Sequence, residues 1–527
     1  MDAPHTLPLD ARQTLDRIGI KREAYSDGTL FVRSAIDGSR LAKLRETDGK
    51  QADAAMARSV KAFASWRETG LGERLELVRL IGEHLRRHAA DLAHIITLET
   101  GKPLADSLEE VTQAIARCDY ASGLGHQIHG TAGVPEQRNQ YTYDAWHPLG
   151  PTGCITSFNQ TVLQYAVHAF ITVMCGNTVI WKPSEKSSLS ALAVFEVIQQ
   201  AVRQFGKAPQ GLFELLLGGR DIGKLLCEDS RISLVSASGS MNAGRTIGLK
   251  LAQRFSRSLL HLGGNNAALI CPSADLGLAL PQIVDAVCFS SGQCCRNLRR
   301  LFVYEEIYDE VVTRLKSALD RVPVGDPLDP ATAMGPLIGR AAFESMQRAL
   351  QEVRAEAAPV TGGERVLAER YPLAYYVKPA VVEMAEQDGP MLRETLAPIV
   401  YVMRVSSVRE AIALNNDADA GLASSIFSRD LDETNEFFGP NGNDCGMANL
   451  NLCLCRGESG LPFGGNKASG GGRTAGTDFW KSHMRRAVVT LSFEAEPRVS
   501  PAIRKAVAAA ELAAAAQGSS KSPPRTR

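Results

Sequence analysis

Gly153-Cys154-Ile155-Thr156-Ser157-Phe158 is a short apolar run that predicts a β-strand, and Thr178-Val179-Ile180-Trp181-Lys182 predicts a second strand. Helical patterns lie between and after these runs, at Val162–Met174 and Ser188–Phe205. The same block holds further strand candidates at Leu212–Leu217, Ile232–Ser236 and Asn266–Ile270. This alternation of strand and helix predicts an α/β fold with a doubly wound parallel sheet, whose ligand crevice lies at the carboxyl ends of the strands.

A second α/β block is predicted from about Ala274 to Gly460. Its strand candidates are Leu301–Tyr304, Ala380–Val382, Ile399–Val405 and Ala423–Phe427.

Amphipathic helices precede the first block. Apolar residues recur at intervals of three and four in Ala54–Trp66, Leu75–His88 and Ala105–Ser122, with a break at Leu98–Pro103. Tyr141–Trp146 then alternates bulky with small or polar residues, as an exposed strand does. The tail from about Pro501 is rich in alanine and then in Ser, Lys, Pro and Arg, which favours a frayed helix leading into disorder.

Composition restricts the class of protein. The chain has 527 residues, of which 44% are hydrophobic and 22% charged, enough for two or three domains with proper cores. Basic and acidic residues are equal at 58 each, which argues against nucleic acid and favours a small-molecule partner. The 11 cysteines show neither a disulfide framework nor zinc spacing, so we expect reduced thiols in the cytoplasm and no metal. No apolar run has the length of a signal peptide or a membrane span, so export and membrane insertion are not expected.

The segment Phe289-Ser290-Ser291-Gly292-Gln293-Cys294-Cys295-Arg296 is the candidate for chemistry. Its small, polar and glycine residues would let a substrate approach a thiol, and a thiolate attacks carbonyl carbon when nearby cations or dipoles lower its pKa. Arg296, Arg299 and Arg300 could supply the positive field or form a solvated face. The alternative is that Cys294 and Cys295 are two small buried apolar residues, as most cysteines are.

Other polar turns follow the predicted strands. Ser238–Gly244 precedes a helical stretch and could meet a pyrophosphate at a helix N-terminus, although it lacks the usual GxGxxG pattern. Trp181–Glu185 places a cation and an acid after a strand, where they could hold ribose hydroxyls. The Asn159 amide could donate to a developing oxyanion. Glu394–Pro398 and Pro462–Lys467 are further turns of this kind, and each turn taken singly is more often structural than functional.

Taken together and in this order, these segments resemble the NAD(P)-dependent aldehyde dehydrogenase superfamily from about Ala35 to Phe493. The motifs that carry the resemblance are Phe158-Asn159, Trp181–Glu185, Gly239-Ser240, Leu262–Asn266, Gly292-Gln293-x-Cys295, Glu394-Thr395-x-Ala397-Pro398 and Pro462–Gly465. Within the superfamily, the chain looks similar to the α-aminoadipic semialdehyde (piperideine-6-carboxylate) dehydrogenase branch, also called antiquitin-like. The segments similar to that branch are Leu262–Ala267, Asn443–Gly446, Gly470–Lys481 and Met484–Arg486.

The resemblance implies an aldehyde dehydrogenase-like α/β fold. It implies a Rossmann-type cofactor domain (1–128 and 149–262), an α/β catalytic domain (263–468), a small β oligomerisation element (129–148 and 469–497) and a flexible tail (498–527). The exposed edge strand Tyr141–Trp146 would be an aggregation liability unless another subunit covered it. We therefore expect a homodimer or homotetramer.

The resemblance also implies the residue roles. Cys295 would be the nucleophile, and Asn159 with the backbone N–H of Cys295 would form the oxyanion hole. Glu394 would hold the nicotinamide ribose, and Phe463 would pack beside the nicotinamide. The remaining residues that would bind the cofactor are Lys182 and Glu185 at the adenosine ribose, Ser240 at the pyrophosphate, and Ser157, Ser184, Gly239 and Gly263.

Three positions depart from the pattern. The hydrolytic base of the family is a Glu just before Leu-Gly-Gly, and here that position is His261. A neutral imidazole with a pKa of ~6.5 can accept a proton from water, but a paralogue with a non-catalytic histidine is an equal alternative. Cys294 stands where the aminoadipic branch has an arginine suited to a substrate carboxylate. Cys453–Ser459 replaces the small-residue anchor loop, and its Arg456 could contact a carboxylate or be solvated.

The resemblance implies NAD-dependent oxidation of a small-molecule aldehyde, such as a semialdehyde of amino acid or lysine catabolism, to a carboxylic acid. A carboxylate at Glu185 would repel the 2′-phosphate of NADP and so favours NAD. The implied route passes through a Cys295 thiohemiacetal and thioester. Two alternatives are a CoA-acylating dehydrogenase and a catalytically impaired paralogue that binds nucleotide.

Overall fold

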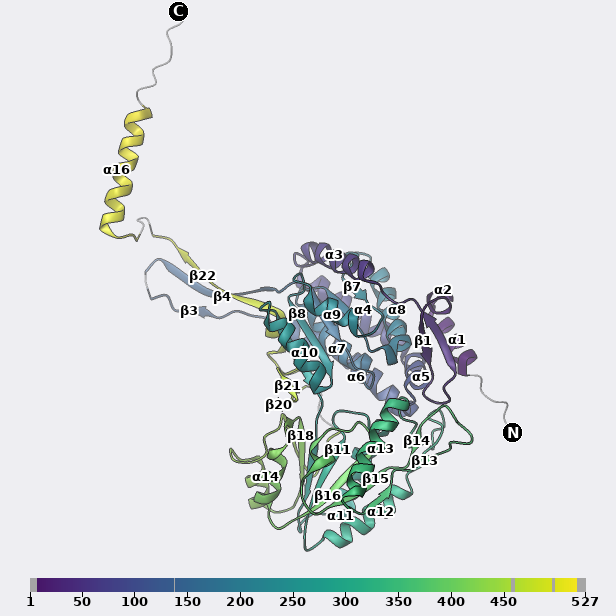
Figure 1. Ribbon diagram of the computed structural model, residues 1–527. Helices are drawn as coiled ribbons and strands as arrows, with labels where there is room; N and C mark the ends of the chain where they lie inside the picture. The colour runs from purple at the N-terminus through teal and green to yellow at the C-terminus, as the bar shows by residue number, and fades with distance from the viewer. Residues whose placement is uncertain (1–6, 137, 456–459, 495–497, 519–527) are drawn as a thin grey trace, which may run out of the picture. The chain divides into compact units, whose positions relative to one another are not determined.

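The computed structural model describes residues 7–136, 138–455, 460–494 and 498–518. Two compact units are present, a larger one formed by residues 1–128 and 148–485 and a smaller one formed by 129–147 and 486–527. In Figure 1 the two large sheets of the larger unit can be seen, one in its upper part around β8 and one in its lower part around β11 and β16. Among the described residues, no helix is both long and apolar enough to span a membrane.

The first sheet has six strands in the order β21-β9-β8-β5-β6-β7. Neighbouring strands from β9 to β7 are parallel, and β21 is antiparallel to β9. The strand bounds are β5 Thr152–Ile155, β6 Val179–Lys182, β7 Phe213–Leu215, β8 Leu234–Gly239, β9 Arg257–Leu262 and β21 Gly470–Gly471. The predicted doubly wound parallel sheet is confirmed, so the ends of β5, β6 and β8 face one crevice.

Alternation along β6 explains why helices cover both faces of this sheet. Ile180 packs with α3 (Gly49–Trp66), α9 (Arg220–Glu228) and α10 (Met241–Ala252). The next residue, Trp181, points to the opposite face because successive strand side chains alternate. There its ring stacks on Tyr165 of α7 (Thr161–Met174) at a centroid distance of 3.9 Å. Both sides of β6 are thus buried, which matches its uninterrupted apolar run.

The second sheet has seven strands in the order β12-β15-β16-β11-β10-β18-β19. One face packs on α11 (Leu276–Cys288) and α12 (Tyr308–Asp320), and the other on α13 (Arg340–Ala355) and α14 (Val408–Asp417). The strand bounds are β10 Asn266–Ile270, β11 Leu298–Tyr304, β12 Val360–Gly362, β15 Ala380–Met384, β16 Ile399–Val405, β18 Ala423–Phe427 and β19 Met447–Leu450. All of its neighbouring pairs are parallel except β12 and β15.

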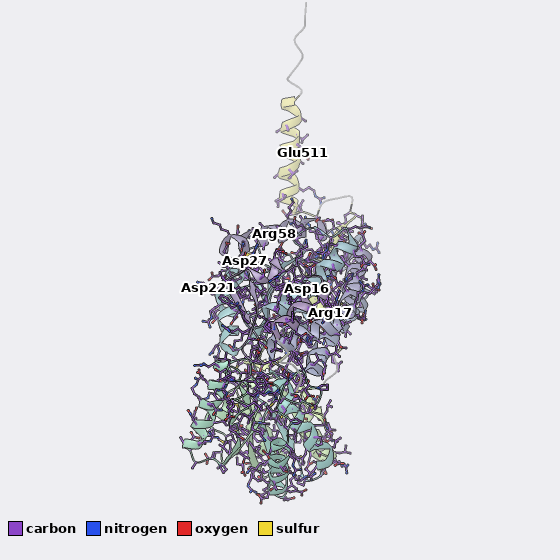
Figure 2. All side chains as sticks on the ribbon, turned by 90° about the vertical axis from the view of Figure 1, so that its right-hand side faces the viewer. Asp16, Arg17, Asp27, Arg58, Asp221 and Glu511 are labelled. Carbon is purple, nitrogen blue, oxygen red and sulfur yellow. The ribbon has the colours of Figure 1, made fainter. Side chains whose placement is uncertain are left out.

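Further helices and short two-stranded sheets complete the larger unit. Arg17 and Arg58, both labelled in Figure 2, link distant elements. Arg17 of α1 (Leu7–Ile18) donates to Asp91 of α5 (Ala89–Thr100) at 2.7 Å, and Arg58 of α3 forms two hydrogen bonds with Glu214 of β7. The remaining helices are α1 Leu7–Ile18, α2 Glu23–Ser26, α4 Leu71–Arg87, α5 Ala89–Thr100, α6 Leu104–Gly125, α8 Ser188–Phe205 and α15 Leu431–Phe438. The remaining strands are β1 Leu30–Arg33, β2 Arg40–Leu44, β13 Arg365–Val366, β14 Tyr376–Val377, β17 Ala420–Gly421 and β20 Asn466–Lys467.

Two sequence-based assignments differ from the structure. Asn266–Ile270 is a strand as predicted, but its assignment to the first sheet was wrong, because β10 pairs with β11 and β18 in the second sheet. A strand pattern encodes burial and not the identity of the neighbouring strand. Arg257–Leu262 was not predicted at all, since its polar first residues weaken the pattern, yet it forms β9 beside β8.

The smaller unit contains a three-stranded sheet in the order β22-β4-β3. Its elements are β3 Ala132–Gly133, β4 Gln140–Pro148, β22 Met484–Ser492 and α16 Pro501–Gly518. Asp144 of β4 and Arg486 of β22 form an ion pair that joins the strands. Apolar side chains remain exposed on this sheet, with Val488 at 72% and Phe493 at 70%. Residues 469–485 lie in the larger unit, and residues 519–527 of the tail fall outside the described residues.

Candidate active site

The turn before Cys295 has an uncommon backbone. Ser290 and Ser291 have φ values of 51° and 56°, in the left-handed region that non-glycine residues rarely adopt. Gly292 follows with φ of 70°, and a Cβ there would collide with the backbone of Pro398. Glycine is therefore required at Gly292, whereas the serines occupy a conformation that surrounding contacts must hold. Such strain typically occurs at functional sites.

Contacts from distant segments hold this turn. Ser290 N donates to Asp106 Oδ2 of α6 at 3.1 Å, and Ser291 Oγ donates to Gly335 O at 3.0 Å. Arg299, at the start of strand β11, donates through Nη2 to Gly292 O at 2.7 Å. Burial raises the pKa of Asp106 to about 6, against the lowering effect of its bond from Ser290. The turn is thus fixed by both halves of the larger unit.

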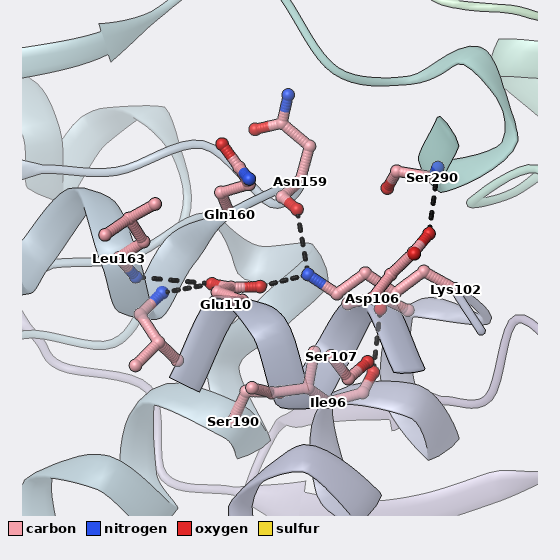
Figure 3. Close-up of polar contacts among 12 residues, drawn as sticks. Ile96, Lys102, Asp106, Ser107, Glu110, Asn159, Gln160, Leu163, Ser190 and Ser290 are labelled. Carbon is pink, nitrogen blue, oxygen red and sulfur yellow. Dashed lines mark hydrogen bonds and ion pairs between the residues drawn. The ribbon is translucent and has the colours of Figure 1, made fainter. Parts of the chain in front are cut away.

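A buried ion pair positions Asn159, at the end of β5. Lys102 Nζ contacts Glu110 and donates to Asn159 O at 3.1 Å, as Figure 3 shows. Glu110 Oε1 also accepts from the backbone N–H of Val162 at 2.8 Å, at the start of α7. The Asn159 side chain then donates through Nδ2 to Gln293 O at 2.8 Å, directly beside the thiol turn. The Lys102–Glu110 pair therefore fixes the backbone that carries the candidate oxyanion donor.

Replacing Lys102 with alanine is expected to destabilise the fold by about 3–5 kcal/mol, because the Glu110 carboxylate would remain buried without its cation. The side chains of the pair are only 5% and 1% exposed. Calorimetric melting of the variant and the wild type measures the loss. Arg79→Ala is the matched control, since its pairs with Glu76 and Glu83 are about half exposed, and exposed pairs contribute roughly 0–1 kcal/mol. Equal melting temperatures for the two variants would contradict the structural role of the buried pair.

One cavity of about 290 Å³ brings most of the candidate residues together. Cys295, Asn159 and His261 all line it, although they come from three separate segments. The candidate cofactor residues that line it are Ser157, Gly239, Ser240, Gly263, Glu394 and Phe463. Lys182, Ser184 and Glu185 are not among the lining residues, and they lie at the end of β6 and the start of the short helix η1 (Glu185–Ser187).

The two neighbouring thiols ionise as a pair beside Arg296. A hydrogen bond from Cys295 and the nearby guanidinium lower the pKa of Cys294 to about 5, against the raising effect of burial. The hydrogen bond to Cys294 and burial raise the pKa of Cys295 well above its ordinary value, and Arg296 opposes them. Cys294 is fully buried, whereas Cys295 is partly exposed to the cavity, so Cys295 is the thiol that a substrate can reach.

His261 lies in β9, where it pairs with Ser238 of β8 on one side and Gly470 of β21 on the other. Burial, assisted by the positive charge of Arg473, lowers its pKa from 6.5 to about 4. The imidazole is therefore neutral at physiological pH and carries a lone pair that can accept a proton. This pKa is lower than the ordinary imidazole value of ~6.5 on which the sequence analysis relied, and the role of His261 as a base stays a prediction.

The backbone at Gly263 lies directly against the side chain of Glu394. A Cβ at Gly263 would collide with the Glu394 carboxylate, whose Oε1 accepts from Gly264 N at 3.0 Å. Burial raises the pKa of Glu394, with Arg299 opposing this effect. Nearby, Ser240 caps α10 through a 3.3 Å contact from Ala243 N, so the helix N-terminus faces the cavity that Ser240 lines. A buried acceptor and helix N–H groups match the hydroxyls and the pyrophosphate of a dinucleotide.

Lys182 and Glu185 form a second polar group in the same sheet. Burial lowers the pKa of Lys182, whose side chain is largely enclosed, and Glu185 opposes this effect. Ser184 caps η1 by accepting from Lys186 N at 3.3 Å. A largely buried cation next to a carboxylate offers both a donor and an acceptor, which is the chemistry that ribose hydroxyls need.

The sequence did not indicate several residues that line the cavity. They include Arg117 of α6, Gln160 just before α7, and His168 within α7. His168 was the only histidine in the predicted helix Val162–Met174, and this was the signal available in the sequence. Cys453 and Cys455 are buried in the core next to the thiol turn, and Cys455 Sγ contacts Arg296 O at 3.6 Å. Residues 456–459 of the loop Cys453–Ser459, including Arg456, lie outside the described residues.

Comparison with known proteins is consistent with this geometry. The model of the aldehyde dehydrogenase family matches residues 23–489. Alpha-aminoadipic semialdehyde dehydrogenase from Rattus norvegicus is 37% identical over 86% of this chain and 84% of its own length. Aldehyde dehydrogenase family 7 member A1 from Malus domestica is 34% identical over 88% and 90%. A point mutant of betaine aldehyde dehydrogenase from Staphylococcus aureus, solved in complex with NAD+, is 25% identical with a TM-score of 0.85, over 89% of this chain and 95% of that chain.

Proposed function

The chain belongs to the aldehyde dehydrogenase family, and on that premise we propose that it oxidises an aldehyde to a carboxylic acid with NAD through a covalent intermediate on Cys295. The observation that supports this most is that Cys295, Asn159 and His261 line one cavity, with Cys295 as the accessible thiol. We place the protein in the cytoplasm, because its eleven cysteines are free thiols.

The residues that line the cavity, together with those at the end of β6 beside it in the same sheet, fit NAD. Lys182, Ser184 and Glu185 would hold the adenosine ribose, Ser157, Gly239 and Ser240 would lie along the pyrophosphate, and Gly263, Glu394 and Phe463 would hold the nicotinamide end. The Glu185 carboxylate favours NAD over NADP, because it would repel a 2′-phosphate. The nicotinamide, when bound, supplies the acceptor for the hydride that the substrate carbon loses.

The chemistry of the chain's own residues then follows. The Cys295 thiol releases its proton to water in the cavity, and its sulfur attacks the aldehyde carbon. The carbonyl oxygen becomes an oxyanion that accepts hydrogen bonds from Asn159 Nδ2 and from the backbone N–H of Cys295. Asn159 Nδ2 already donates one of its two hydrogens to Gln293 O, so the amide is oriented and one N–H remains for the oxyanion. After oxidation the carbon is held as a thioester. His261 then accepts a proton from the water that attacks this thioester.

We propose that the substrate carries a carboxylate, as α-aminoadipic semialdehyde does. The curated relative named for that activity supports this class. Arg117 and Arg296 also line the cavity, and Arg296 lies 5.8 Å from the Phe463 ring centre. Their positive charges would favour an anionic group on the far end of the substrate.

The test is a screen of aldehydes, with and without a terminal carboxylate, against NAD and NADP with NADH or NADPH absorbance as the readout. We expect sustained turnover with NAD and a carboxylate-bearing aldehyde, and mass spectrometry should trap a thioester on Cys295. One NADH per subunit followed by a stop, relieved by coenzyme A, would favour an acyl-transferring dehydrogenase. Nucleotide binding without a burst for any aldehyde would show a protein that only binds.

We also propose that the smaller unit joins subunits into a homodimer or homotetramer. Its sheet exposes apolar side chains, with Val488 at 72% and Phe493 at 70%, and an exposed strand is a liability unless it is covered. Light scattering coupled to size exclusion at micromolar concentration should therefore give a mass of two or four chains. Val488→Lys together with Phe493→Ser should shift the mass toward one chain. A monomeric wild type would rule out this assembly.

A further inference from the structure

The guanidinium of Arg299 bonds two separate loops beside the cavity. Arg299 is the second residue of β11, and it is only 1% exposed. Its Nη2 donates to Gly292 O at 2.7 Å and to Cys294 O at 3.2 Å, both in the thiol turn. Its Nη1 donates to Ala397 O at 2.5 Å, in the loop that carries Glu394. One buried cation therefore joins the loop of the proposed nucleophile to the loop of a proposed cofactor residue.

The charge of Arg299 is compensated by Glu394. The three acceptors above are neutral carbonyl oxygens, and Arg299 Nε is buried without a partner among the described residues. A buried charge is costly unless another group compensates it. Burial raises the pKa of Glu394 and Arg299 opposes the rise, while burial lowers the pKa of Arg299 and Glu394 opposes the fall. Each group thus stabilises the charged form of the other.

Other ionisable groups surround this pair. Those that interact with the charge of Arg299 are Cys294, Cys295, Cys455 and Tyr401. Burial raises the pKa of Tyr401 and of Cys455 well above their ordinary values, so both stay neutral. Cys294 differs, because the hydrogen bond from Cys295 lowers its pKa to about 5, and its negative charge raises the pKa of Glu394. The positive charge of Arg299 therefore counteracts both burial and this thiolate at Glu394.

We propose that Arg299 is a positioning residue that keeps Glu394 a carboxylate for the nicotinamide ribose and holds the thiol turn in place relative to it. The inference rests on the proposed function, because it requires NAD at Glu394 and a reacting thiol at Cys295. Arg299 is not among the residues that line the cavity, so it acts through these two groups and does not touch the substrate.

The protonation state of Glu394 decides which hydrogen bonds it can make. Glu394 Oε1 accepts from Gly264 N at 3.0 Å, which orients the group. An ionised carboxylate accepts hydrogen bonds at both oxygens, whereas a protonated carboxyl must donate one of its own. The form that accepts from two ribose hydroxyls is the carboxylate, and it is present above the pKa. Without the charge of Arg299 this pKa would rise, so the accepting form would be lost at a higher pH than in the wild type.

The test is the dissociation constant of NAD for the full-length protein, measured by isothermal titration calorimetry over a range of pH. Affinity in the wild type should fall as the pH decreases through the pKa of Glu394. Arg299→Gln should move this midpoint upward by about one to three pH units, the shift caused by removing an opposite charge beside a carboxylate. Arg299→Met is a second uncharged variant, should the first fold poorly. A merely structural defect would weaken binding by one factor at every pH and leave the midpoint unchanged.

Lysine at this position separates charge from geometry. Arg299→Lys keeps a cation beside Glu394 but lacks the planar fork that bonds several carbonyl oxygens at once. The pH midpoint of NAD affinity should therefore stay close to that of the wild type. The NADH burst should slow by about 10- to 100-fold, because a thiol displaced by a fraction of an ångström to an ångström reacts less well. A burst equal to that of the wild type would show that the fork does not hold the thiol turn.

A double variant and a neighbouring arginine complete the design. Glu394→Gln should remove the pH midpoint, and Arg299→Gln in that background should cost less NAD affinity than it does alone, because the two effects share one interaction. Arg300→Gln is the matched control. Arg300 follows in β11, is equally buried, and donates to Asn265 O at 2.9 Å and to Leu414 O at 3.0 Å. Its loss should lower the melting temperature without moving the midpoint.

The outcomes distinguish this inference from the proposed function. A wild type that does not bind NAD, or that gives no NADH burst with any aldehyde, rejects the proposed function. A wild type that binds NAD and turns over normally, with the uncharged variants of Arg299 showing the wild-type midpoint, rejects only the role of Arg299. An Arg300→Gln variant with the same shift in midpoint as Arg299→Gln would also overturn that role, because the effect would then not be specific to the charge beside Glu394.

Discussion

Replacing Cys295 with serine is expected to abolish both the NADH burst and steady-state turnover, by about 10⁵-fold or more, the scale seen when a covalent nucleophile is removed. A serine hydroxyl has no activating base at this position and is far less nucleophilic than a thiolate. Stopped-flow absorbance of NADH gives the burst and the steady state in one measurement.

The neighbouring cysteine provides the matched control. Cys294→Ser should retain both phases, because Cys294 is fully buried and does not line the cavity. Serine does not ionise, so Cys295 no longer faces the negative charge of a Cys294 thiolate, which helps to raise its pKa, while Arg296 still stabilises its own thiolate. The burst should therefore persist to lower pH than in wild type. Loss of the burst in Cys294→Ser with activity kept in Cys295→Ser would reverse the assignment.

Replacing His261 with alanine is expected to leave the burst and reduce steady-state turnover by about 10²–10⁴-fold, the range for loss of a general base. Oxidation to the thioester precedes the step that needs the base. His261→Glu should keep or raise turnover, because a carboxylate at the same place can accept the proton. Equal turnover in wild type and His261→Ala would show that the histidine is not the base.

The expected pH dependence of steady-state turnover follows from the pKa of His261. A base acts in its deprotonated form, which is present above its pKa, and burial with Arg473 lowers the pKa of His261 to about 4. Turnover limited by this group should therefore rise only near pH 4 and stay level from about pH 5 to 8. The sequence alone predicted a rise near 6.5. A hydrolytic step that titrates near 6.5 and loses this dependence in His261→Glu would contradict the buried environment seen here.

Much of the fold could be predicted because local patterns determined it. The apolar run at Val179–Lys182 is buried on both faces, which is why its periodicity was readable. Strand neighbours were harder to predict. β10 was recognised as a strand but assigned to the wrong sheet, and β9 was missed although it carries His261, because Arg257 and Ser258 are exposed at its start.

The sequence predicted those candidate residues that belong to recognisable motifs. It did not predict the features that depend on how distant segments pack together. Cys295, Asn159 and His261 came from the family resemblance, and the structure places them at one cavity. Nothing in Ser290 and Ser291 favours left-handed backbone, since distant contacts impose it. His168 was missed because a single histidine in an apolar helix is usually a core residue, and only the packing of α7 against β9 brings it to His261.

The anchoring of the thiol turn has a consequence for how the protein becomes competent during synthesis. Ser290 is held by Asp106, 184 residues earlier in the chain, and Ser291 by Gly335, which lies later. A nascent chain that ends before Gly335 already contains Cys295, Asn159 and His261. It still lacks the Gly335 carbonyl oxygen, which accepts the hydrogen bond from Ser291. Domains generally fold as units during synthesis, and contacts between residues far apart in the sequence form slowly. We therefore expect the thiol turn to reach its final geometry only after Gly335 has emerged from the ribosome.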